Sequence, residues 1–246
     1  MSWRGGIPRR EHQRECSMNR KTVEQFRLAL FGRMVMGMSH EVDNHLSVVL
    51  GFAELLQVMG GEEKKVLEGA GKILSAGEKI AAIIKQFSHY VRPHAPVAES
   101  FSFFTVLSEI VLFSRYDLGR GNVTLVMPAS EGPGRMQGDS RDYALALLAV
   151  LLNGAEAMAG RGGALTVGAA VREGYCHVTV ADRGTGIPQE IMPRIFEERF
   201  TTKPESLHSG MGLPVARHIV SGMGGDITVE NLPGEGCLVA LRVPAI

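Results

Sequence analysis

The chain has 246 residues, of which 45% are hydrophobic, 21% charged and 6% aromatic, a composition typical of globular proteins rather than disordered or fibrous ones. Basic and acidic residues both number 26, so a polyanionic partner such as nucleic acid is disfavoured. The longest aliphatic stretch, residues 144–152, is about half the roughly 18 apolar residues of a membrane span. With no readable secretory signal either, we expect a cytoplasmic chain without a membrane span.

Residues 1–20 lack periodicity and predict a loose N-terminal arm, whereas residues 21–92 predict a helical hairpin broken at Gly60-Gly61. Each helix carries a seam of apolar residues at alternating steps of three and four, which only His45 breaks. The seams are Leu28, Phe31, Val35, Met38, Val42, His45, Val49, Phe52, Leu56, Met59, and then Val66, Ala70, Ile73, Gly77, Ile80, Ile84, Phe87, Val91. Further apolar residues widen each stripe beyond what one helix covers, so we expect a homodimer built on a four-helix bundle.

Pro93 and Pro96 end the second helix and mark a linker over residues 93–100. Residues 101–246 contain both the apolar spacing of helices and the alternation of strands. They predict an α/β sandwich, with helices on one mostly antiparallel sheet. We expect helices at 104–117, 139–159 and 211–223 and strands at 122–127, 164–171, 176–182, 225–230 and 237–243. The fold class is therefore α+β.

His40 falls at an outward position of the first helix, so its imidazole is expected to face water. Glu41 follows it, and Asn44 lies one turn later on the same face. A carboxylate that accepts a hydrogen bond from one ring nitrogen raises the nucleophilicity of the other. We therefore take His40 as a candidate nucleophile; the alternative is an ordinary solvated histidine.

The predicted strand at 176–182 runs into the sequence Asp182-Arg183-Gly184-Thr185-Gly186-Ile187. An aspartate at a strand end accepts a hydrogen bond from an exocyclic amine, and glycines leave room for a flat ligand. Asp182, Gly184 and Gly186 thus predict a ligand pocket, unless they only form a glycine turn.

Gly210 and Gly212 open a predicted helix whose first N–H groups suit a phosphate, and Lys203 precedes them. Asn153 offers an amide oxygen of the kind that Mg²⁺ accepts, and Glu156 offers a carboxylate to hold a coordinated water. Each feature has an ordinary structural explanation. Together they predict a site for phosphate and metal.

These segments resemble, in family order, the motifs of the transmitter core of two-component sensor histidine kinases, over about residues 30–244. The matches are residues 38–44 to the H box, 151–157 to the N box, 182–187 to the G1 box, 195–197 with 200–203 to the F box, and 210–213 to the G2 box. The resemblance implies a dimerisation and histidine-phosphotransfer hairpin over residues 21–92. It also implies an ATP-binding domain of the gyrase and Hsp90 type over residues 101–246.

The resemblance further implies that the γ-phosphoryl group of ATP passes to His40 and then to an aspartate of a response regulator. In the ATP-binding domain it implies that Asp182 recognises adenine, that Asn153 binds Mg²⁺ and that Lys203 neutralises phosphate, with room for the nucleotide at Gly184, Gly186, Gly210 and Gly212. In the hairpin it implies that Glu41 accepts the proton of His40. It also implies that Asn44 orients a water when the regulator is dephosphorylated. The sensor input is expected to come from a partner or from a region that the chain lacks.

Three residues depart from the family pattern: Ala149 for a polar N-box residue, His208 for a G2 glycine, and His45 for a proline. The first two would favour an alternative function, a catalytically weakened nucleotide-binding dimeric scaffold. A third interpretation, an ATPase of the gyrase and Hsp90 type, is disfavoured by the outward H box. His45 is expected to be a neutral core histidine or, alternatively, a group whose protonation loosens the bundle.

Overall fold

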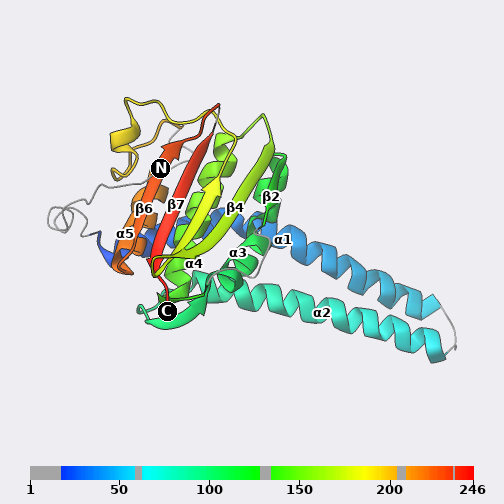
Figure 1. Cartoon of the computed structure of the whole chain (residues 1–246). Helices are drawn as coiled ribbons and strands as arrows, with labels where there is room; N and C mark the ends of the chain where they lie inside the picture. The colour runs from blue at the N-terminus through cyan, green and yellow to red at the C-terminus, as the bar shows by residue number, and fades with distance from the viewer. Residues whose placement is uncertain (1–17, 59–62, 128–133, 204–208, 235) are drawn as a thin grey trace.

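Two long antiparallel helices form a hairpin that projects far beyond the rest of the molecule (Figure 1). The structure is a computed structural model and describes residues 18–58, 63–127, 134–203, 209–234 and 236–246. Helix α1 spans Arg20–Val58 and α2 spans Glu63–Val91. The predicted hairpin is confirmed, while Met59 and the break between the helices lie outside the described residues.

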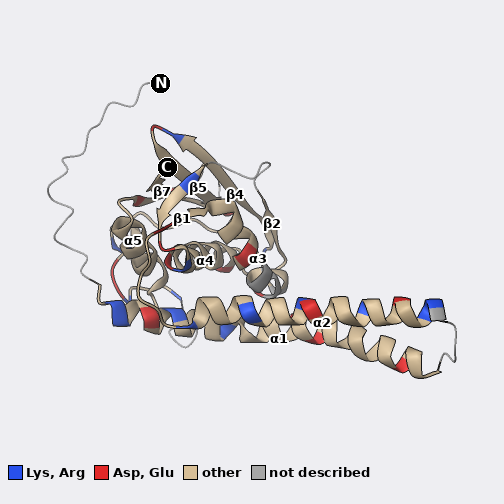
Figure 2. Ribbon diagram, turned by 90° about the horizontal axis from the view of Figure 1, so that it is seen from below, with Lys and Arg blue, Asp and Glu red and all other residues tan. Residues whose placement is uncertain are grey.

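Both basic and acidic residues occur along each hairpin helix (Figure 2). This mixture agrees with the balanced composition of the chain. None of the described helices has the length and apolar character that crossing a bilayer requires.

The register of the hairpin differs from the prediction in the first half of α1. Leu28 and Val35 are 48% and 42% exposed, whereas Leu30 and Met34 are buried. The reason is that this half of α1 packs on α3 and α5 as well as on α2, so a different face of the helix is covered. Beyond Gly37 every described α1 residue is exposed or half-buried, because only α2 accompanies it there.

The covered face of α2 also differs from the predicted seam, because at every second seam position the buried residue is the one just before the predicted residue. Ile73, Ile80 and Phe87 are half-buried on the covered side of α2, as expected. The fully buried positions that alternate with them are Gly69, Ala76, Ile83 and Tyr90. Ala70, Gly77 and Ile84 are exposed. The chain by itself therefore leaves a second apolar face of α2 open.

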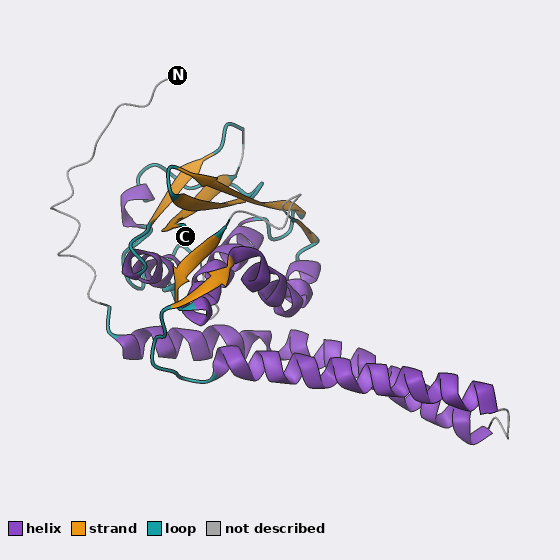
Figure 3. Ribbon diagram, turned by 60° about the horizontal axis from the view of Figure 1, so that its bottom comes forward, coloured by secondary structure: helices purple, strands orange, loops and turns teal. Residues whose placement is uncertain are grey.

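The α/β domain, from β1 to β7, places one layer of helices between the hairpin and a twisted sheet (Figure 3). Its helices are α3 (Phe103–Arg120), α4 (Ser140–Ala157), the short 3-10 helix η1 (Met192–Arg194) and α5 (Gly212–Gly222). Its strands are β1 (Glu99–Ser102), β2 (Val123–Val126), β3 (Arg135–Gly138), β4 (Gly163–Arg172), β5 (Tyr175–Ala181), β6 (Asp226–Asn231) and β7 (Cys237–Pro244).

The main sheet has the order β2-β4-β5-β7-β6, and β2 with β4 is its one parallel pair. The predicted α+β class with a mostly antiparallel sheet is thus confirmed. The prediction missed the second sheet, in which β1 pairs antiparallel with β3, because four-residue strands leave little periodic signal.

Helix α4 is the centre of the core, since each of its residues from Asp142 to Leu152 is buried. Its apolar run explains the longest aliphatic stretch of the sequence, because the sheet covers one side of α4 and other helices cover the rest. Asp139 caps the helix by accepting hydrogen bonds from the backbone N–H groups of Arg141 and Asp142. Cys176 and Cys237 are buried and form no disulfide with each other.

Candidate functional site

His40 is an exposed residue of α1, just past the half of the helix that the α/β domain covers. Its Nδ1 lies 3.2 Å from Nδ2 of Asn44, one turn further along the same face. Glu41 points elsewhere: its Oε1 lies 3.8 Å from Nε2 of His45. Glu41 therefore lies beside His45, and the acidification hypothesis for His45 stays a prediction.

Asp182 follows β5 and is only 5% exposed. Its Oδ1 accepts hydrogen bonds from the N–H groups of Gly184 (2.7 Å) and Cys237 (3.2 Å). Burial raises the pKa of Asp182, and these two N–H groups and Lys203 oppose that rise without cancelling it. The second oxygen, Oδ2, takes no hydrogen bond from the described residues and is left as an acceptor for a ligand.

The loop after Asp182 packs closely against α4 and is held by a residue that the sequence did not single out. A Cβ on Gly184 would lie 2.7 Å from the carbonyl oxygen of Ala157, so no side chain fits there. Gly186 has a φ of 72°. Asn231 accepts a hydrogen bond from the N–H of Ile187 (2.8 Å) and donates one to its carbonyl oxygen (2.7 Å). This two-way bond fixes the backbone next to Gly186.

The second glycine pair lies where α5 begins. Gly210, at a φ of 63°, touches the F-box backbone so closely that a Cβ would lie 2.5 Å from the carbonyl carbon of Arg199. Gly212 is the first residue of α5 and adjoins Asn153, whose Nδ2 would be 3.0 Å from an added Cβ. Helix α5 starts without a side-chain cap, which leaves its first N–H groups to another acceptor.

Glu156 joins this site to the hairpin. Its Oε2 lies 2.6 Å from Nζ of Lys203, and its Oε1 lies 2.8 Å from Nη2 of Arg33 on α1. The sequence analysis missed Arg33, because its partner is distant in the chain and no local pattern marks it. Arg33 precedes His40 by two helical turns, about 10 Å along the axis.

Of two open cavities, one borders the loop after Asp182 and the other lies away from the candidate nucleotide residues. The smaller, about 360 Å³, is lined by the loop from Thr185 to Pro188 and by Asn231. The larger, about 670 Å³, lies between α2 and the β1–α3 segment, with none of the candidate nucleotide residues in its lining. We assign the site by its chemistry, because a buried carboxylate, two glycine loops and an uncapped helix start occur together around Asp182 and Gly212.

Residues 138–246 match the family model described as histidine kinase-, DNA gyrase B- and HSP90-like ATPase. This segment is similar to the ATPase domains of that family. The sensor histidine kinase ZraS of Klebsiella oxytoca is 28% identical over 239 residues, which are 96% of this chain and 51% of ZraS. The chain thus spans about half the length of this curated relative.

Solved histidine kinases share the fold of the ATPase domain and hairpin. The mycobacterial sensor histidine kinase MprB superimposes with a TM-score of 0.52 at 25% identity, covering 60% of this chain and 97% of that one. Histidine kinase ThkA, solved in complex with the response regulator protein TrrA, gives a TM-score of 0.53 at 21% identity over 91% of this chain and 64% of that one. These matches support a two-component histidine kinase transmitter core, as the motifs predicted.

Of the three departures from the family pattern, two are placed by the structure. Ala149 is 2% exposed inside α4, where an apolar side chain suits its surroundings. His45 lies half-buried in the hairpin. His208 lies outside the described residues.

Proposed function

We propose that the chain is the catalytic core of a sensor histidine kinase, which transfers the γ-phosphoryl group of ATP to His40 and then to an aspartate of a response regulator. The observation that carries the proposal is the grouping of Asp182, the glycine loops, Asn153 and Lys203 on the ATPase domain, next to a helix that presents an exposed histidine. The comparisons support this function over the scaffold alternative.

Asp182 is the proposed selector of adenine. Its free Oδ2 would accept a hydrogen bond from the exocyclic amine, while Gly184 and Gly186 keep the neighbouring backbone clear of side chains. The uncapped start of α5 at Gly212, close to Gly210, suits the negative phosphates. The residues present therefore fit a nucleotide.

Asn153 is the proposed ligand of Mg²⁺, since its amide lies against the first residue of α5, where the phosphates would be. A bound Mg²⁺ would neutralise charge on the transferring phosphoryl group. Lys203 adds a positive charge at the same place once it leaves Glu156, its present partner at 2.6 Å.

At the hairpin, a ring nitrogen of His40 forms a bond to phosphorus while the bond from phosphorus to the ADP oxygen breaks. The ring proton passes to Glu41, which must first turn from His45. Asn44, at 3.2 Å from the ring, is placed to orient a water when the phosphoryl group of the regulator is hydrolysed.

The proposed assembly is a homodimer with a response regulator as its partner in phosphotransfer. Six apolar or small residues form an exposed stripe on α2 at the helical spacing of three and four: Leu67, Ala70, Leu74, Gly77, Ala81 and Ile84. A second copy of the hairpin would cover this stripe. The ThkA complex supports a response regulator as the partner.

Incubation with γ-labelled ATP and Mg²⁺ tests the function. We expect labelled protein whose phosphoryl group is acid-labile and alkali-stable, and no label in His40→Gln. Label that persists in His40→Gln would reject His40 as the acceptor. Free phosphate without labelled protein would instead indicate a simple ATPase, and nucleotide binding without either product would indicate the scaffold.

A further inference from the structure

The F-box motif contains two phenylalanines, Phe196 and Phe200, that the proposed reaction does not use. They belong to residues 188–203, which connect the loop after Asp182 to Lys203 and which we call the F-box segment. Apart from η1, this segment, all of which the structure describes, contains no helix or strand. Side-chain contacts must therefore hold it in place on the domain.

A series of turns gives the F-box segment its shape. The N–H groups of Ile191, Arg194, Glu197 and Phe200 each donate to the carbonyl oxygen three residues earlier, at 2.9 to 3.3 Å. Each of these bonds joins residues that are close in the chain. The turns therefore fix the shape of the segment but not its position on the domain.

Arg217, in the second turn of α5, connects the F-box segment to the rest of the domain. Its guanidinium carbon lies 4.9 Å from the centroid of the Phe196 ring, within the range of a cation–π interaction. Phe196 also packs against the buried apolar core. The ring is thus anchored both to the core and to α5, the helix whose uncapped start is the proposed phosphate site.

A second arginine, Arg194, acts inside the F-box segment. Its guanidinium carbon lies 4.3 Å from the centroid of the Phe200 ring, and its Nε donates to Oε2 of Glu197 at 3.0 Å. The side chains of Arg194 and Glu197 are 54% and 53% exposed, so solvent screens this ion pair. These contacts are as local as the turns. Of the two arginines, Arg217 is the one that ties the segment to another element.

The F-box segment ends at the residues proposed to bind phosphate. A Cβ on Gly210 would lie 2.7 Å from the carbonyl oxygen of Phe200, so the two backbones are in contact. The N–H of Lys203 donates to Oγ1 of Thr201 at 3.1 Å, which ties Lys203 to the residue next to Phe200. A displaced Phe200 would therefore change the positions of both Gly210 and Lys203.

The place of Arg217 in α5 argues against a direct contact with phosphate. Arg217 follows Gly212, the first residue of α5, by five positions. It therefore lies about 7.5 Å along the helix axis from the first N–H groups. Its guanidinium lies against the ring of Phe196 instead. An effect of Arg217 on the nucleotide would thus pass through the F-box segment.

We infer that Arg217 is a positioning residue, which anchors the F-box segment through the ring of Phe196 so that Gly210 and Lys203 meet the phosphates of ATP. This inference rests on the proposed function. ATP binds the anchored arrangement, so weaker anchoring lowers the fraction of molecules that are ready to bind. The apparent dissociation constant rises by the same factor.

The test compares Arg217→Met, which removes the charge but keeps an apolar chain, with Arg217→Lys, which keeps a cation. Arg242→Met is the matched control, because it removes an exposed arginine whose guanidinium carbon lies 4.7 Å from the centroid of the Tyr175 ring, on the sheet. We expect Arg217→Met to raise the KM for ATP in labelling of His40 about threefold, the order of an exposed cation–π pair, with kcat unchanged. Arg217→Lys and Arg242→Met should stay near the wild type.

A double-mutant cycle shows whether Arg217 acts through the ring. Phe196→Leu keeps an apolar side chain against the core but removes the ring. Adding Arg217→Met to Phe196→Leu should then raise the KM no further. A further threefold rise would overturn the inference, because Arg217 would act on something other than Phe196. An unchanged KM in Arg217→Met, or an equal rise in Arg217→Met and Arg217→Lys, would overturn it as well.

Two readouts do not depend on phosphoryl transfer. Titration with a fluorescent ATP analogue should give the same threefold loss of affinity in Arg217→Met. The amides of residues 191–200 should exchange hydrogen faster in Arg217→Met than in Arg242→Met, with unchanged protection of β4, β5 and β7 as evidence that the fold is intact. Unchanged exchange would overturn the inference. A wild-type chain that binds ATP but takes no label would reject the proposed kinase, while the changes in affinity and exchange would still support the anchor.

Discussion

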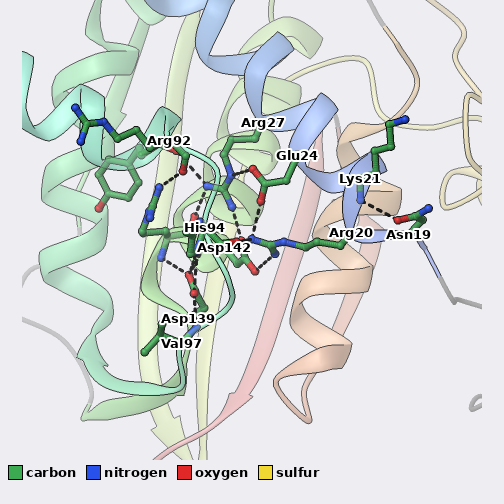
Figure 4. Close-up of polar contacts among 12 residues, drawn as sticks. Asn19, Arg20, Lys21, Glu24, Arg27, Arg92, His94, Val97, Asp139 and Asp142 are labelled. Atoms are coloured by element: carbon green, nitrogen blue, oxygen red, sulfur yellow. Dashed lines mark hydrogen bonds and ion pairs between the residues drawn. The ribbon is translucent and has the colours of Figure 1, made fainter.

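Arg33 Nη2 on α1 lies 2.8 Å from Oε1 of Glu156 on α4, and the other oxygen of that carboxylate lies 2.6 Å from Nζ of Lys203. One carboxylate therefore connects the hairpin to the residue proposed to neutralise phosphate. Because the Arg33 side chain is 44% exposed, solvent screens this pair and it contributes little stability by itself. The first half of α1 is held to the α/β domain by its buried apolar side chains, such as Leu30 and Phe31, together with the buried pair of Arg27 and Asp142 (Figure 4).

Asp182→Ala should weaken ATP binding by about 1.5–3 kcal/mol, the range for a hydrogen bond to a charged group. The wild type should also bind GTP poorly, because guanine carries a carbonyl where adenine carries the amine. Isothermal calorimetry measures both. Equal affinities of the wild type for ATP and GTP would contradict adenine recognition by Asp182.

Asp182 should also make the stability of the nucleotide-free protein depend on pH. Burial raises the pKa of Asp182 in the folded state, so folding favours the neutral carboxyl. Its contribution to stability is present below the unfolded pKa and is lost as the pH rises through the folded pKa. Asp182→Asn stays neutral, so its melting temperature should rise relative to wild type between pH 4 and pH 7. Glu230→Gln, on an exposed position of β6, is the control; a constant difference for Asp182→Asn across this range would contradict the prediction.

Asn231→Ala should weaken nucleotide binding by about 1 kcal/mol, since the bonds that it loses to Ile187 are partly open to water. Asn231→Asp keeps the acceptor but loses the donor, and should fall between Ala and the wild type. Titration with a fluorescent ATP analogue gives the three affinities. If all three agreed, Asn231 would have no part in positioning the loop around Gly186.

Asn44→Ala should leave labelling of His40 nearly unchanged while slowing the loss of phosphate from the response regulator severalfold. The reason is that Asn44 contacts the ring of His40 without serving as its base. Single-turnover assays separate the two activities. A parallel fall in both would mean that Asn44 maintains the hairpin or the ring position instead.

The exposed stripe on α2 should mediate dimerisation. Leu74→Glu places a charge in the stripe, where Leu74 is 66% exposed in the single chain, and should shift the protein toward monomer. Lys64→Glu, on an exposed polar position of the same helix, should leave the dimer intact. Light scattering at micromolar concentration reports the mass; a monomeric wild type would refute the proposed dimer.

Local patterns in the sequence were sufficient for the order of the hairpin helices and of the strands of the main sheet, but not for β1 and β3. The hairpin follows from apolar periodicity and a Gly-Gly break, and the sheet follows from short alternating runs between turn residues. Asp182, Gly210 and Lys203 could be recognised because the chemistry of each depends on a few neighbours in the chain. These signals all act within one helix, strand or loop.

Tertiary structure decided which face of each element is covered and which distant charges meet. The periodicity of α1 allows either Leu28 with Val35 or Leu30 with Met34 to face inward, and packing on α3 and α5 selects the second pair. Arg27 and Asp142 are 115 residues apart, so nothing near either residue marks the other as its partner. The physical reason is that a side chain's environment is set by whatever element packs on it, and only the folded chain brings those elements together.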